Sequence, residues 1–138
     1  MTTIAYRDGI MASDSGMYGY GTLDASMQKI FYLFDGRVFA GCGDAALVLQ
    51  VRDWLNGGEK PDPKDRDAGG IIADPAGNVW LLDKNLVEMP VTGPFFADGS
   101  GNALAMGAMA AGADAVKAIE IAKIYDSHTA GAVQWLKV

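Results

Sequence analysis

The sequence predicts a layered α+β sandwich that folds as one domain of 138 residues. Short β-forming runs are joined by residues typical of tight turns, and stretches with helical spacing follow them. Three such turns are present: Asp8-Gly9, Asp35-Gly36 and the DPAGN segment at 74–78. Hairpins interspersed with helices in this order favour sheets that pack on helices and on each other.

The run 27–34 supports this prediction, because both of its alternating faces are apolar. One face holds Met27, Phe31 and Leu33 with Lys29 among them, and the other holds Ile30, Tyr32 and Phe34. A strand of this kind is covered on both sides. A lysine on a covered face costs free energy unless it is paired, so Lys29 is a candidate functional residue. The alternative is an edge lysine that discourages further strand pairing.

A first helix is predicted between the second and third hairpins. Asp44 can act as its N-cap, and Gly57 ends it. The apolar residues at helical spacing are Leu47, Val51 and Leu55. The polar segment 59–67 follows and contains two prolines, which predicts a solvated loop.

Two further helices are predicted at 102–111 and 114–125. Gly112 separates them, and Asp114 can cap the second. The final stretch 131–138 returns to a strand pattern. The order of elements is therefore two hairpins, a helix, a third hairpin, two helices and a last strand.

The amino-acid composition argues against several classes of function. There are 17 acidic and 11 basic residues, a formal charge of −6, and no basic run, which argues against nucleic-acid binding. Cys42 and His128 are the only residues of their types, which disfavours disulfide frameworks and zinc clusters and fits a reducing cytoplasm. No secretory signal or apolar stretch of roughly 20 residues is recognisable, so we expect no membrane span and a mature N-terminus apart from Met1.

The first residues suggest a nucleophile. Removal of Met1, which is usual before a small residue, would leave Thr2 with its hydroxyl and a free α-amine. The amine can serve as the base for the hydroxyl. If Asp8-Gly9 is a two-residue turn, counting outward sets Thr3 opposite Asp14 and Thr2 opposite Ser15. A carboxylate is therefore predicted beside the N-terminus.

The second hairpin is predicted to bring a lysine to the same region. If Asp35-Gly36 is also a two-residue turn, Lys29 lies opposite Cys42, and Ile30 lies opposite Gly41. Lys29 would then lie beside the glycine-containing AGCG segment, where bare backbone N–H groups can approach a reacting carbonyl. A Cys42/His128 dyad is conceivable, but nothing in this register brings the two side chains together.

Four ordered segments carry a resemblance: TTIAYRDGIMASDS, QKIFYLFDGRVFAG, DGSGNALA and YDSHTAGAV. Together they resemble the proteasome β-subunit family, most of all its bacterial HslV-type peptidases. The resemblance implies an N-terminal-nucleophile hydrolase with a four-layer αββα sandwich. The chain is shortened in the first helical layer, because loop 59–67 stands where the family has a second long helix.

The resemblance also implies roles for individual residues. Thr2 is implied as the nucleophile, Asp14 as its acidic partner and Lys29 as the cation. Gly41 is implied as the oxyanion donor, with Gly43 as the alternative. The implied supporting residues around the N-terminus are Ser100, Asp126 and Thr129.

The activity that the resemblance implies is that of a threonine endopeptidase without cofactor or metal. Its implied partners are a polypeptide substrate, further copies of the chain in a ring or double ring, and an ATP-dependent unfoldase. Two alternatives remain open. The first is a small-molecule amidase with the same site, and the second is a self-assembling module without catalysis.

Overall fold

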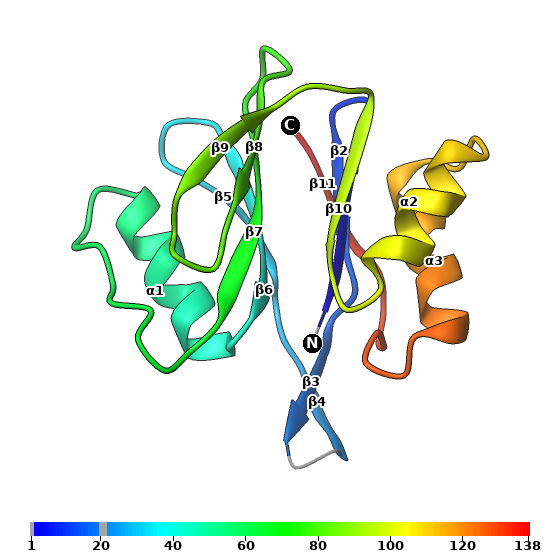
Figure 1. The fold of residues 1–138 in the computed structure, drawn as a ribbon, viewed down its shortest axis with the longest axis horizontal. Helices are drawn as coiled ribbons and strands as arrows, with labels where there is room; N and C mark the ends of the chain where they lie inside the picture. Colours follow the sequence, from blue (N-terminus) through cyan, green and yellow to red (C-terminus); the bar gives the residue numbers. More distant parts are fainter. Residues whose placement is uncertain (1, 20–21) are drawn as a thin grey trace.

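The computed structural model describes residues 2–19 and 22–138, which form eleven strands and three helices (Figure 1). The strands are β1 (Thr3–Arg7), β2 (Ile10–Ser13), β3 (Gly16–Gly19), β4 (Thr22–Ser26), β5 (Ile30–Tyr32), β6 (Val38–Gly43), β7 (Ala68–Ala73), β8 (Val79–Leu82), β9 (Glu88–Val91), β10 (Phe95–Gly99) and β11 (Gln134–Lys137). The helices are α1 (Ala45–Leu55), α2 (Asn102–Ala110) and α3 (Ala115–Tyr125). The predicted mixture of sheets and helices is confirmed.

The strands form two main sheets and one projecting ribbon. One sheet has the order β10-β1-β2-β11, and the other has the order β5-β6-β7-β8-β9. Helices α2 and α3 lie on the outer face of the first sheet, and α1 lies on the outer face of the second (Figure 1). The β3–β4 pair extends beyond the end of both sheets (Figure 1).

Alternation along the strands fills three apolar cores. In β1, Ile4 and Tyr6 belong to the cluster between the two sheets, whereas Ala5 packs toward α2 and α3. In β6, Ala40 joins the cluster between the sheets, and Phe39 joins the cluster under α1. Because successive side chains of a strand point to opposite faces, each sheet is apolar on both faces.

The helix predictions are confirmed at their termini. Asp44 caps α1, with its carboxylate accepting the Leu47 N–H at 2.8 Å. Asp114 caps α3 in the same way through the Lys117 N–H. Gly57 and Gly112 follow the preceding helices with φ values of 100° and 109°, which glycine adopts without strain.

The register predicted for the first hairpin is confirmed as far as Thr3 and Asp14. Arg7 pairs with Ile10 and Ile4 with Ser13, and the Asp14 N–H donates to the Thr3 carbonyl. Asp14 therefore stands opposite Thr3, close to the start of the chain. The removal of Met1 concerns a residue outside those that the structure describes.

The register predicted for the second hairpin is wrong by one residue. Ile30 pairs with Ala40, not with Gly41, so Lys29 faces Gly41 and not Cys42. The reason is a longer turn, in which the Leu33 N–H donates to the Arg37 carbonyl across three intervening residues. Strand β5 is also shorter than the run 27–34, and Tyr32 and Phe34, expected on a covered face, are exposed.

Four strands were not anticipated: β3, β4, β9 and β10. Strand β10 matters most, because it pairs with β1 and ends at Gly99, opposite Thr3. Segment 59–67 is free of helix and strand, as predicted. Within residues 2–19 and 22–138, no helix has both the length and the apolar composition required to cross a membrane.

Candidate active site

A buried ion pair lies close to the start of β1. Lys29 Nζ is 3.0 Å from Asp14 Oδ1, and their side chains are 3% and 0% exposed. The Asp14 carboxylate also accepts the N–H groups of Thr3 and Ala130, so both of its oxygens are bonded. The structure thus joins two of the predicted site residues, Asp14 and Lys29.

The environment of Lys29 acts on its charge in two directions. Burial lowers the pKa of its ammonium from the ordinary value of 10.5, while the Asp14 carboxylate acts to raise it. Gln134, on β11, fixes the backbone that leads into this lysine, accepting the Lys29 N–H and donating to the Met27 carbonyl. The lysine is therefore held by Gln134 as well as by Asp14.

A second network surrounds Thr2 and Thr3. The Ser100 N–H donates to the Thr2 carbonyl at 2.8 Å, and Ser100 Oγ donates to Asp126 Oδ2 at 2.6 Å. Thr129 Oγ1 donates to the same Asp126 oxygen and lies 2.6 Å from Thr3 Oγ1. The predicted supporting residues are thus linked to one another and to the first strand.

Asp126 carries the charge of this second network. Partial burial raises the pKa of its carboxyl, but the hydrogen bonds from Ser100 and Thr129 outweigh burial and lower it below 3.8. The carboxylate therefore remains charged near neutral pH and holds both hydroxyls in a fixed orientation.

Gly41 does not fit the oxyanion role predicted for it. Its N–H already donates to the Lys29 carbonyl at 2.9 Å, as the corrected register requires. Gly43 lies two residues after Gly41 on β6, so its N–H points to the same side of the strand as the Gly41 N–H. The Asp44 N–H, by contrast, donates to Asp67 on the β7 side.

On the side of β6 to which the Gly43 N–H points, the segment before β5 does not pair with Gly43, because the Met27 N–H donates to the Ser15 carbonyl instead. Gly43 has φ +105°, and a Cβ at this position would overlap the backbone of Asp67 and Ala68. Glycine is therefore required here both by conformation and by space.

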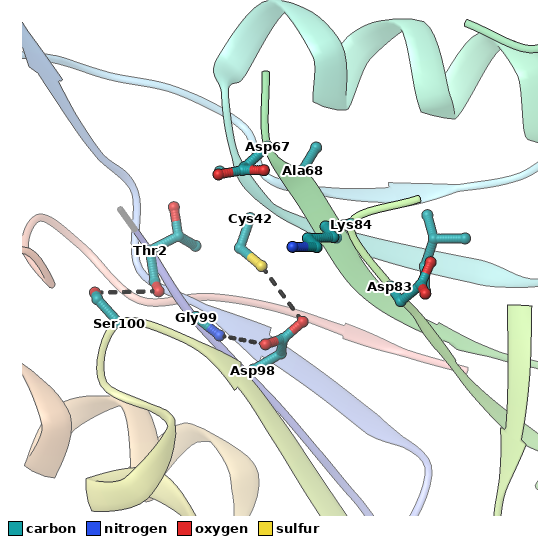
Figure 2. Close-up of a pocket in the computed structure, with 12 residues that line it drawn as sticks. Thr2, Cys42, Asp67, Ala68, Asp83, Lys84, Asp98, Gly99 and Ser100 are labelled. Carbon is teal, nitrogen blue, oxygen red and sulfur yellow. Dashed lines mark hydrogen bonds between the residues drawn. The ribbon is translucent and has the colours of Figure 1, made fainter. Parts of the chain in front are cut away.

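Thr2 lines cavities on two sides. One, of about 380 Å³, also includes Cys42, Asp98 and Ser100 (Figure 2). The other, of about 680 Å³, extends past Lys29 to the β3–β4 ribbon. Gly43 lines both cavities. A substrate that enters either cavity would therefore meet Thr2 and the Gly43 backbone.

Comparison with known proteins identifies the fold. No protein-family model matches the sequence, and no curated protein matches it. Among solved structures, Thiobacillus denitrificans BPH in complex with epoxomicin matches at 20% identity and a TM-score of 0.75, covering 99% of this chain and 97% of that one. A second structure of Thiobacillus denitrificans BPH matches at 20% identity and a TM-score of 0.74, covering 99% of this chain and 96% of that one. The chain has the fold of BPH.

Within this BPH-like fold, the site includes residues that the sequence did not predict. Thr3 bonds Thr129 and accepts the Gly101 N–H, and Asp98 accepts from the Cys42 thiol. Gly99 has φ +97°, and any Cβ there would overlap the Thr2 carbonyl. The DGSG segment that contains Asp98 and Gly99 is one of those that carry the family resemblance, but its pairing with the first strand is seen only in the structure.

The conceivable Cys42/His128 dyad is not formed in the BPH-like fold. Cys42 contacts Asp98 between the sheets, whereas His128 packs edge-on against Tyr18 at a centroid distance of 5.8 Å. Burial and the nearby Asp98 raise the pKa of the Cys42 thiol, which keeps it protonated and a poor nucleophile. Among the described residues, no group of three histidine, cysteine or acidic side chains could hold a metal ion.

Proposed function

We propose that this chain is a threonine-type peptidase of the N-terminal-nucleophile kind, with Thr2 as nucleophile after removal of Met1. The observation that carries the proposal is the position of Thr2. It lines two cavities and adjoins both the buried Asp14–Lys29 pair and the network of Ser100 and Asp126. The fold shared with BPH, which binds epoxomicin, a proteasome inhibitor, supports the proposal.

The first half of the reaction forms an ester. The free α-amine of Thr2 accepts the proton of its own hydroxyl as Oγ attacks the carbonyl carbon of the peptide bond. The Gly43 N–H meets the resulting oxyanion, which contributes on the order of 3 kcal/mol in a site that excludes water. Collapse breaks the C–N bond, and the ammonium returns its proton to the leaving amine.

The second half regenerates the enzyme. The α-amine takes a proton from water, and the hydroxide attacks the ester carbonyl. The C–Oγ bond then breaks as the ammonium returns the proton to Oγ, and the product leaves as a carboxylic acid that ionises in water. Lys29 acts through its positive charge, which stabilises the anionic form of the nearby nucleophile, and Asp14 holds that charge in position. Asp126 orients the hydroxyls of Ser100 and Thr129 around the N-terminus.

Several finer features belong to the same proposal. We assign the arrangement of sheets and helices to the four-layer αββα sandwich, shortened after α1, and the activity to the kind found in HslV-type peptidases. Polypeptide substrates, assembly of several copies into a ring, and an unfoldase partner follow from that assignment. The single cysteine fits a reducing cytoplasm.

The test combines mass spectrometry with a threonine-directed electrophile. The untagged chain should lose Met1, and incubation with a peptide epoxyketone should add one adduct that maps to Thr2. Thr2→Ala should abolish the adduct and lower peptide hydrolysis by at least about a thousandfold. Thr92→Ala, at an exposed position outside the site, is the matched control and should react like the original chain. Retention of Met1, or a processed chain without adduct, would contradict the proposal.

A further inference from the structure

The cavity of about 380 Å³ beside Thr2 is charged as well as large enough for a side chain. Carboxylates come from three separate elements: Asp67 precedes β7, Asp83 follows β8, and Asp98 lies on β10. One ammonium, that of Lys84, faces them (Figure 2). No ion pair among the described residues joins Lys84 to any of the three. Three negative charges against one positive charge leave the cavity acidic.

Asp98 is the carboxylate best placed to meet a ligand. It is half-buried, lies two residues before Ser100 and, among the described residues, accepts only a thiol at 3.5 Å and the N–H of its neighbour Gly99. A thiol is a weak donor, so the carboxylate keeps strong acceptor capacity. Asp83 differs, because its Oδ1 already accepts the N–H groups of Asn85 and Val87 in a tight turn.

We propose that this cavity binds a cationic side chain of the substrate, lysine or arginine, next to the scissile bond, with Asp98 as the carboxylate that selects it. The inference rests on the proposed peptidase function and specifies its substrate class. The apolar stem of such a side chain would contact Ala68 and Leu82, which also line the cavity. Its charged end would form a charge-assisted hydrogen bond with Asp98.

The experiment compares two quenched peptides that are identical except for lysine or norleucine next to the cleaved bond, tested on either side of it. Norleucine has a similar shape without the charge. The lysine peptide should have a kcat/KM about tenfold higher at low salt, and the advantage should shrink as ionic strength rises. Asp98→Asn should reduce this ratio about three- to tenfold.

A second variant, expected to change the lysine-to-norleucine ratio in the opposite direction, keeps the test valid if Asp98→Asn folds poorly. Lys84→Gln removes the competing ammonium at an exposed position and should raise the lysine-to-norleucine ratio. Lys117→Gln, on the outer surface of α3, removes the same charge away from the cavity and should leave the ratio unchanged.

The outcomes separate the two proposals. Equal rates for both peptides, or a ratio insensitive to Asp98→Asn and Lys84→Gln while Thr2 still forms its adduct, would overturn this inference and leave the peptidase function standing. Absence of any Thr2 adduct would overturn the function and this inference with it. A ratio that falls in Asp98→Asn and rises in Lys84→Gln would support both.

Discussion

Single residues decide the chemistry here through their burial. The Lys29–Asp14 pair is buried where β2 ends and β5 begins, and a buried charge without a partner is costly. Each charge compensates the free-energy cost of burying the other, so removal of either one alone destabilises the fold. The same burial makes Lys29 a fixed positive charge beside the proposed nucleophile.

Lys29→Met should therefore lower the free energy of unfolding by about 3–5 kcal/mol, because Asp14 is left buried and charged. The double variant Asp14→Asn/Lys29→Met should recover part of this loss, since neither site then carries a charge. Urea unfolding of the single and double variants measures both values. Strictly additive losses would show that the two groups do not interact.

The pKa of Lys29 gives stability a predictable pH dependence. Burial lowers this pKa below 10.5 in the folded state, so the unfolded chain binds the proton more tightly. Stability relative to Lys29→Met should rise with pH from the lowered pKa up to 10.5, and level off above it. Urea unfolding from about pH 8 to about pH 11 tests this, with Lys117→Met as the control for general charge effects. A difference that falls with pH would contradict it.

The sequence predicts the positions of those site residues that can be placed by counting outward from a tight turn. Asp14 was found because Asp8-Gly9 forms the two-residue turn that the count assumed. The pairing of Lys29 with Cys42 was predicted wrongly, because the turn before Arg37 is longer than the two residues that the count assumed. Asp98 and Gly99 act through pairing between strands far apart in sequence, and such pairing is set by the whole sheet.

At the scale of elements, the turn of the second hairpin depends on a glycine conformation. Gly36 has φ +90°, a conformation that costs other residues strain, and nothing within 4 Å would clash with an added Cβ. Gly107 also has open space but lies inside helix α2 with ordinary helical geometry. These two glycines therefore separate backbone conformation from packing.

Gly36→Ala should destabilise the protein by about 1–2 kcal/mol, because alanine must adopt the left-handed region. Gly107→Ala should stabilise it by about 1 kcal/mol, because alanine favours the helix. Thermal unfolding of both variants measures the difference. The same sign for both would mean that conformation is not what distinguishes these positions.

The whole molecule is organised as two sheets with helices on their outer faces, and each interface has its own apolar core. Helices α2 and α3 bury mostly alanines, so they approach the sheet closely, and Met109 is the largest side chain that α2 buries. Removing it should therefore leave a cavity that neighbouring alanines cannot fill.

Met109→Ala should cost about 2–5 kcal/mol of stability. Met106→Ala on the same helix is the matched control, and should cost no more than about 0.5 kcal/mol, since Met106 is 36% exposed and Met109 is 1% exposed. Urea unfolding of both variants checks the packing of α2 on the sheet. Equal losses would show that the helix does not rest on this face.

The β1–β2 turn and the end of β11 meet, because the Val138 N–H donates to the Gly9 carbonyl. Figure 1 shows the C-terminus and the N-terminus at opposite ends of the sheets, and Thr2 with its cavities lies at the N-terminal end. A dye or affinity handle attached near Gly9 or Val138 would therefore leave the mouth of the cavity open. Such a handle would allow immobilised or single-molecule assays in which the first residue stays unmodified.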